Sequence, residues 1–148
     1  MKKIGLTFIL ISILISCNSS DSKKSTADLK KEIIKTEKEF EAYCSKNGIA
    51  NGFYTFADSN AVIKLKNDSL LIGKLGIKNH FDKTISKSAK VTWDADFVDV
   101  SDDGTMAYTY GKYIWTVTDS IGNKKEFKGI FHTVWKKQKD GSWKYVWD

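Results

Sequence analysis

The chain contains no arginine and no proline, and it has only two cysteines and two histidines. Arginine supplies the planar guanidinium that grips phosphates and base edges, so its absence argues against a nucleic-acid partner despite a formal net charge of +6. A solvated lysine surface that keeps a domain soluble explains that charge. Because proline is the residue that sheet interiors exclude, its absence leaves every predicted strand free to lie inside a sheet.

The scarcity of cysteine and histidine also restricts the possible metal sites. His80 and His132 lie far apart, and neither HExxH nor CxxC spacing occurs, which argues against a zinc site. The acidic run between Asp94 and Asp103 lacks the glycine and the terminal glutamate of a calcium loop. We therefore expect no metal and no cofactor.

The one long apolar run, residues 4–15, follows two lysines and ends in the tetrapeptide LISC, whose last residue is Cys17. A cationic start, about a dozen apolar residues and a small residue before a cleavage point are typical of a secretory signal. The run is shorter than the roughly 20 residues that span a membrane. The tetrapeptide resembles the bacterial lipobox, in which cleavage leaves a lipidated cysteine. This predicts a signal peptide over 1–16, lipid attachment at Cys17, and a protein anchored to the bilayer of the cell envelope. We expect the outer membrane, on its periplasmic or surface side.

A polar segment separates the apolar run from the rest of the chain. Residues 18–26 are rich in serine, aspartate and lysine and contain no large apolar side chain, so residues 17–27 are expected to form a flexible tether. The remaining residues, 28–148, suffice for one domain and are too few for two. With Cys17 acylated, Cys44 has no partner for a disulfide and is expected to be a core residue.

Apolar side chains at helical spacing predict helices in the first part of the domain. Ser25 and Thr26 can cap a helix that runs to about residue 46. Gly48 ends that helix, and a short second helix is expected to end near residues 58–60. A third helix is expected over about 74–87. The apolar stripe of the first helix consists of Leu29, Ile33, Phe40 and Cys44.

The later part of the chain alternates in the manner of strands. The expected strands are 61–66, 70–72, 91–97, 105–118, 127–135 and 142–148. The segment 105–118 is apolar or aromatic on both faces, which predicts a central strand covered on both sides, and Gly111 indicates a bulge in it. Helices followed by an antiparallel meander indicate the α+β class. A twisted four-strand sheet curls, and the helices bury their stripes in its concave side.

Short motifs in the meander point to a known superfamily. They are Trp93, Ala107–Tyr113, Gly129, Val134–Lys137, Asp140–Lys144 and Asp148. Together with the order of the elements, they resemble the nuclear transport factor 2-like fold, which includes SnoaL-type cyclases and ketosteroid isomerase. The resemblance covers about residues 28–148 and implies a cone of helices packed in a curved antiparallel sheet. It also implies a homodimer, since relatives often pair through the convex side. The fold hosts enzymes, ligand carriers and assembly modules, so the resemblance does not imply a reaction.

The resemblance places the catalytic groups of ketosteroid isomerase on three positions of this chain. The carboxylate base falls near Leu65, the tyrosine near Phe40, and the protonated acid near Thr133. None of the three residues has the required chemistry. A proton shuttle needs a positioned base, so catalysis of the steroid-isomerase type is not expected.

Dense aromatic residues and one acid define a candidate pocket. By strand alternation, Asp148 points opposite to Trp143, Tyr145 and Trp147. If Val146 faces the concave side, Asp148 reaches the pocket mouth, where it can hold an amine or a hydroxyl of a ligand, or act as a base. The candidate pocket residues are Phe40, Phe53, Tyr110, Thr133, Trp135 and Asp148.

Three functions remain open at this point. The first is a non-catalytic envelope lipoprotein whose cone binds a small, partly apolar molecule. The second is a SnoaL-like isomerase, cyclase or hydrolase that uses Asp148 with Thr133 or a tyrosine. The third is an interaction module that displays the aromatic face of Trp143, Tyr145 and Trp147 to another envelope protein.

Overall fold

The computed structural model describes residues 24–85 and 87–148. Cys17, the predicted signal peptide and most of the predicted tether lie outside these residues. The elements are α1 (Thr26–Asn47), α2 (Ile49–Phe56), β1 (Ala57–Lys64), β2 (Leu70–Ile72), α3 (Lys74–Thr84), β3 (Lys90–Val100), β4 (Met106–Thr118), β5 (Lys124–Lys137) and β6 (Trp143–Trp147). The α+β class is therefore confirmed, with helices preceding a sheet meander.

Helix α1 begins where the sequence predicts it. The Ser25 hydroxyl oxygen accepts a hydrogen bond from the Asp28 backbone N–H at 3.1 Å, which satisfies one of the free donors at the helix start. The helix ends at Gly48, whose φ of 88° favours glycine. Its buried face packs against the core of the sheet and consists of Leu29, Ile33, Glu37, Phe40 and Cys44.

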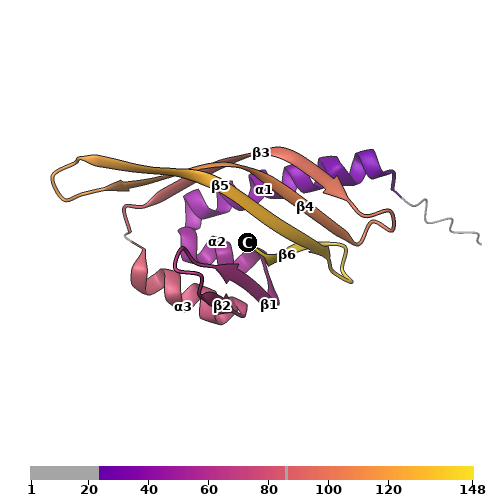
Figure 1. The fold of residues 1–148 in the computed structure, drawn as a ribbon, viewed down its shortest axis with the longest axis horizontal. Helices are drawn as coiled ribbons and strands as arrows, with labels where there is room; N and C mark the ends of the chain where they lie inside the picture. The colour runs from indigo at the N-terminus through magenta and orange to yellow at the C-terminus, as the bar shows by residue number, and fades with distance from the viewer. Residues whose placement is uncertain (1–23, 86) are drawn as a thin grey trace, which may run out of the picture.

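The sheet has six strands in the order β2-β1-β6-β5-β4-β3. All neighbouring pairs are antiparallel except β1 and β6, which are parallel. Figure 1 shows the long strands β3–β5 on one side of the curled sheet and the short strands β1 and β2 on the other, with α2 between them. The sequence predicts a sheet of four strands, and that prediction is wrong. The β1–β2 hairpin joins the sheet only through β6, a partner remote in sequence.

The boundary between α2 and β1 also differs from the prediction. The sequence places Asp58-Ser59-Asn60 at the end of a helix, whereas β1 begins at Ala57, which is buried and pairs with Tyr145. The Asp58 carboxylate accepts a hydrogen bond from the Asn60 backbone N–H at 3.0 Å. This turn-like contact lies where the register between β1 and β6 shifts. The residues that predict a turn therefore form an irregularity within a strand.

Strand β4 is central but is covered on one face only. Ala107 and Thr109 are buried, whereas Tyr108 and Tyr110 are 39% and 42% exposed. The prediction of two covered faces is therefore wrong. The bulge lies in the neighbouring strand β3, between Ala95 and Phe97, and Gly111 lies opposite it.

Gly111 is required by this close approach of the two strands. A Cβ at Gly111 would lie 1.9 Å from the Asp94 carbonyl oxygen, so no larger residue fits without displacing the backbone.

Cys44 is a core residue, as expected, and a Cβ at Gly52 would lie 2.2 Å from its Sγ. Burial raises the pKa of the Cys44 thiol to about 12, which keeps it protonated. Helix α3 ends at Thr84, three residues before the predicted end.

Candidate functional site

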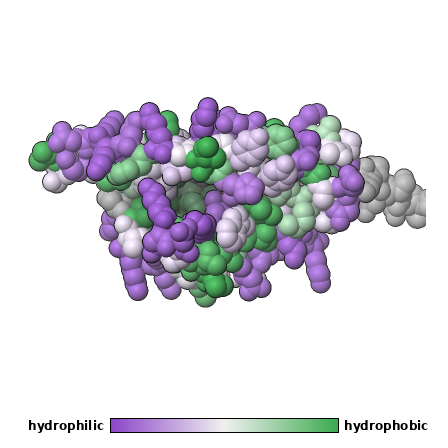
Figure 2. All heavy atoms as spheres, in the orientation of Figure 1, coloured by the Kyte–Doolittle hydropathy of each residue, from purple (hydrophilic) through white to green (hydrophobic). Residues whose placement is uncertain are grey.

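A cavity of about 580 Å³ lies on the concave side of the sheet. Its size is within the range of about 300–1,000 Å³ that small-molecule sites enclose. Figure 2 shows it as a hollow in the surface with hydrophilic residues around the opening. The aromatic residues that line it are Phe40, Phe53, Phe81, Trp93, Tyr113, Trp115, Phe127, Phe131 and Trp147. The ionisable or polar residues are Glu37, Lys64, Lys66, His132, Thr133 and Asp148.

The aromatic wall is held in place by ring contacts. The Phe40 ring centroid lies 4.9 Å from that of Phe53 and 4.9 Å from that of Trp93, both with edge-to-face geometry. The Phe53 ring in turn lies 4.8 Å from that of Phe81 on α3. These contacts join α1, α2, α3 and β3 around the cavity, so its wall is largely formed before any ligand enters.

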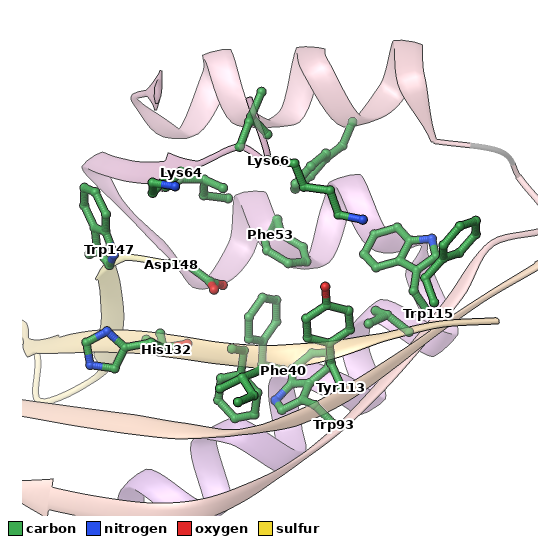
Figure 3. Close-up of a pocket in the computed structure, with 18 of the residues that line it drawn as sticks. Phe40, Phe53, Lys64, Lys66, Trp93, Tyr113, Trp115, His132, Trp147 and Asp148 are labelled. Atoms are coloured by element: carbon green, nitrogen blue, oxygen red, sulfur yellow. The ribbon is translucent and has the colours of Figure 1, made fainter. Parts of the chain in front are cut away.

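Tyr113 brings a hydroxyl group into the cavity because of a glycine on the neighbouring strand. Tyr113 on β4 pairs with Gly129 on β5. A Cβ at Gly129 would lie 2.5 Å from the Tyr113 hydroxyl oxygen, so the ring occupies the space that a side chain would fill. In Figure 3 this hydroxyl points toward the middle of the cavity.

Glu37 is the most unusual residue of the wall, because it is a carboxyl with only 3% exposure. Its oxygens accept hydrogen bonds from the Trp93 indole N–H at 2.8 Å and from the Trp135 indole N–H at 3.0 Å. The Thr109 hydroxyl donates a third, at 2.5 Å. Burial raises the pKa of Glu37, and these three donors act against that rise because they favour the charged form.

Sequence reasoning missed Glu37, although a signal for it was available. The residue lies four positions after Ile33 and three before Phe40, so it occupies the apolar stripe of α1. An acid in the middle of such a stripe must find buried partners or point into a cavity. Here both are true, since Glu37 has three donors and lines the cavity.

Asp148 enters the cavity through an irregularity in β6. Tyr145 pairs with Trp135, and Trp147 pairs with Val134, which is the neighbour of Trp135. The strand β6 therefore contains one extra residue, Val146, at this point. This shift interrupts the alternation of the strand, and Asp148 lines the same interior in which Tyr145 is buried. Figure 3 shows its carboxyl directed into the cavity.

The backbone of Asp148 is fixed by β1. Its N–H donates to the Val62 carbonyl oxygen at 3.0 Å, and its carbonyl oxygen accepts from the Lys64 N–H at 2.9 Å. The residue keeps partial exposure, because the cavity is open to solvent, yet protein surrounds the carboxyl. Burial, with a smaller contribution from Glu37, raises the pKa of the Asp148 carboxyl to about 8. The carboxyl therefore holds its proton at neutral pH.

The structure separates the predicted pocket residues into three groups. Phe40, Phe53, Thr133 and Asp148 line the cavity. Trp135 has no exposure and lies behind the wall, where it donates to Glu37. Tyr110 lies on the outer face of the sheet, with its ring stacked on Phe97 at 5.1 Å, so its assignment to the pocket is corrected. The cause is strand alternation, since Tyr110 points opposite to its neighbours Thr109 and Gly111.

The aromatic surface that the sequence suggests on β6 does not exist as a surface. Trp143 is 5% exposed and Tyr145 has no exposure. The Tyr145 hydroxyl donates to the Phe53 carbonyl oxygen at 2.9 Å, which ties β6 to α2. A display of Trp143 and Tyr145 to a partner is therefore contradicted, and of the three predicted residues Trp147 alone keeps partial exposure. Three exposed aromatic residues, Phe97, Tyr108 and Tyr110, lie instead on the outer face of β3 and β4, and Phe127 on β5 is 38% exposed.

The three positions that the resemblance assigns to isomerase chemistry all lie at the cavity. Leu65, Phe40 and Thr133 line it, and none carries an acid or a phenol. The carboxyl groups of this cavity come instead from Glu37 and Asp148.

Over residues 24–85 and 87–148, no cluster of residues is suited to hold a metal ion. No helix within the same residues is long and apolar enough to cross a membrane.

Comparison with solved structures gives the fold a name. A nuclear transport factor 2-like protein from Salmonella enterica superposes with a TM-score of 0.66, at 17% identity, over 83% of this chain and 89% of its own. A ketosteroid isomerase-like protein from Erwinia carotovora gives 0.63, at 12% identity, over 78% and 90%. The association domain of calcium/calmodulin-dependent protein kinase II from C. elegans gives 0.65, at 16% identity, over 84% and 96%.

These similarities show that the chain has the nuclear transport factor 2-like fold. The expectation drawn from the sequence is confirmed at that level. No protein-family model matches the chain, and no curated protein matches it in sequence.

Proposed function

We propose that the protein binds a small, largely apolar molecule in the cone and releases it chemically unchanged. The single observation that supports this most strongly is the lining of the cavity: about 580 Å³ enclosed mainly by aromatic side chains that already contact one another. A few polar groups, above all Asp148 and Tyr113, fix the orientation of the molecule. This combination of apolar walls and few polar groups is typical of ligand sites.

Binding of N-phenyl-1-naphthylamine, a neutral apolar fluorophore, tests this proposal. We expect its emission to rise on addition of the protein and to fall when a competing apolar ligand is added. Val117→Trp, which adds volume at the cavity wall, should abolish the signal. Ile121→Trp, at an 82% exposed position between β4 and β5, is the matched control and should leave it unchanged. Equal signals from both variants would refute binding in the cone.

A second candidate function is acid–base catalysis, and the position of Asp148 favours it. The carboxyl lies inside the cavity rather than in bulk solvent, and its pKa of about 8 lies close to neutral pH, where a general acid or base works best. Thr133 and Tyr113 supply hydroxyl groups in the same cavity. In this case Asp148→Asn would abolish turnover of a bound substrate while retaining its binding. If the bound molecule is recovered unchanged from the native protein, the non-catalytic function stands.

We further propose that two copies pair through the outer face of the sheet. Phe97, Tyr108 and Tyr110 are each more than a third exposed there, and the Phe97 ring stacks on Tyr110 and contacts Tyr108 at a tilt. An association domain is among the structural neighbours. In sedimentation experiments, Tyr110→Lys should convert a dimer to a monomer, whereas Ile121→Lys, at an 82% exposed position, should not. A monomeric native protein would contradict the pairing.

Anchoring to a bacterial envelope membrane through Cys17 is also a proposal, and it rests on the sequence of residues 1–17. Mass spectrometry of the protein from its native membrane should find Cys17 as an acylated first residue. Cys17→Ser should abolish the modification, and Cys44→Ser should retain it. An unmodified amino terminus that still begins at Met1 would contradict the anchor.

A further inference from the structure

We propose that the ligand is an organic ammonium ion with an apolar body, whose cationic nitrogen lies between the carboxyl groups of Glu37 and Asp148. This inference rests on the proposed function, since it names the chemical class that the cone accepts. It starts from two acids, Glu37 on α1 and Asp148 at the end of β6, that interact with each other and line a largely apolar cavity.

Neither acid forms an ion pair with a lysine among the described residues, although the charge of Lys38 acts on Glu37 at longer range. Glu37 accepts hydrogen bonds only from neutral donors, two indoles and a hydroxyl. The nearest lysine along α1, Lys38, instead contacts the Asp94 carboxylate and the Trp93 carbonyl oxygen. A cation placed between two buried acids favours their charged forms, because opposite charges attract strongly away from water.

The two lysines that line the cavity do not supply the missing charge. Both are exposed, and Lys64 pairs with Asp68. The Lys66 ammonium lies over the Phe127 ring, 5.7 Å from its centroid. Water and salt screen exposed charges, whereas charges at buried groups are screened much less. The groups that can take up a negative charge beside a ligand inside the cone are therefore the carboxyls of Glu37 and Asp148.

The aromatic walls favour the same class of ligand. Ring faces attract cations, and aromatic cages are a common way to bind quaternary ammonium groups. The Phe40 and Trp93 rings belong to this wall, and the Trp93 indole N–H donates to Glu37. A carboxylate ligand would face two acids here, and a neutral ligand would gain no electrostatic attraction from either the acids or the ring faces. An ammonium ion is the class that satisfies both the acids and the rings.

Proton release accompanies binding in this arrangement. Asp148 holds a proton at neutral pH, because burial raises its pKa to about 8. A bound ammonium ion favours the carboxylate form, so the O–H bond breaks and the proton passes to solvent while the ligand keeps its charge. Below the pKa of Asp148, affinity should therefore rise with pH, approaching about tenfold per pH unit, and should level off above it. The titratable groups that face this carboxyl from the surrounding elements are Glu37, Cys44, Lys64, Lys66, Tyr113, His132 and Tyr145.

A matched set of probes separates charge from shape. Benzyltrimethylammonium and neopentylbenzene have the same shape and differ in one atom, nitrogen or carbon, and therefore in charge; phenylacetate carries the opposite charge. Each displaces N-phenyl-1-naphthylamine from the protein. We expect the ammonium ion to bind at least about tenfold more tightly than the other two at about pH 8, and its advantage to shrink toward about pH 6.

Asp148→Asn tests the residue itself, because it removes the charge and retains the shape. We expect ammonium binding to weaken by about tenfold and to lose its pH dependence, while neopentylbenzene binds as before. Asp96→Asn, an exposed acid on β3, is the control and should change neither. Equal or tighter binding of neopentylbenzene or phenylacetate by the native protein would overturn the ammonium inference and leave the proposed pocket intact. Failure of the fluorophore to bind at all would overturn both.

Discussion

Replacing Asp148 with asparagine is expected to stabilise the fold at neutral pH and to leave its stability unchanged in acid. Asparagine has the shape of the protonated acid and cannot ionise. Burial and the neighbouring Glu37 raise the pKa of the Asp148 carboxyl from 3.8 to about 8. The folded protein therefore keeps a proton that the unfolded chain has already released between these two values.

The size of the effect follows from this difference in pKa. Because the unfolded state binds fewer protons, the free energy of unfolding falls as pH rises from about 4 to about 8, and it levels off above that range. Each unit of pKa difference corresponds to about 1.4 kcal/mol, and about three units are in effect at about pH 7. The cost at about pH 7 is therefore about 4 kcal/mol. Because the cavity admits some solvent, we expect a gain of about 2–4 kcal/mol from the substitution.

Urea unfolding of the native protein and the variant, followed by tryptophan fluorescence at several pH values, measures this difference. The two proteins should be equally stable near about pH 4, and the variant should gain progressively up to about pH 8. Asp96→Asn should show no such trend, because this carboxyl is exposed. A difference that does not change with pH, or a native protein that gains stability relative to the variant as pH rises, would refute the reasoning.

Three further substitutions or reactions test the structure around the cavity. Thr109→Val removes one donor to Glu37 and should lower the free energy of unfolding by about 1–3 kcal/mol in the same urea assay; an unchanged value would contradict the buried hydrogen bond. Gly111→Ala should destabilise by more than about 2 kcal/mol, because its Cβ would lie 1.9 Å from the Asp94 carbonyl oxygen. Cys44, buried and with a pKa of about 12, should react with a thiol reagent only at the rate of unfolding, and rapid labelling of the native protein would show that it is accessible.

Local patterns in the sequence predict the helices well because helical signals are local. The Ser25 cap and the glycine at the end of α1 are found where the sequence places them. The spacing of apolar residues does not reveal Glu37, because this residue occupies the same stripe of α1 but is an acid. The buried Glu37 carboxyl is stabilised by two indole N–H groups and the Thr109 hydroxyl. These donors belong to strands β3, β4 and β5. Contacts of that range leave no periodic trace in the sequence.

The strands are predicted less completely than the helices. Their approximate positions follow from alternation, but which side chains face the cavity depends on register. Tyr110 was assigned to the pocket and lies on the outer face. The face of Asp148 was conditional on that of Val146, and a register shift against β5 decides it. Bulges arise from pairing between strands, and one extra residue reverses every later side chain. The sequence of β6 alone therefore cannot give its interior face.

The central claim is that Asp148 is a protonated carboxyl in an aromatic cone that binds ligands. The carbon-13 NMR titration of the Asp148 side chain, assigned by comparison with Asp148→Asn, tests it most directly. We expect a midpoint near a pKa of about 8 in the free protein. Saturation with benzyltrimethylammonium should lower that pKa, and neopentylbenzene should not. A midpoint close to the ordinary pKa of an aspartate, unmoved by either compound, would contradict both the buried acid and the ligand class inferred from it.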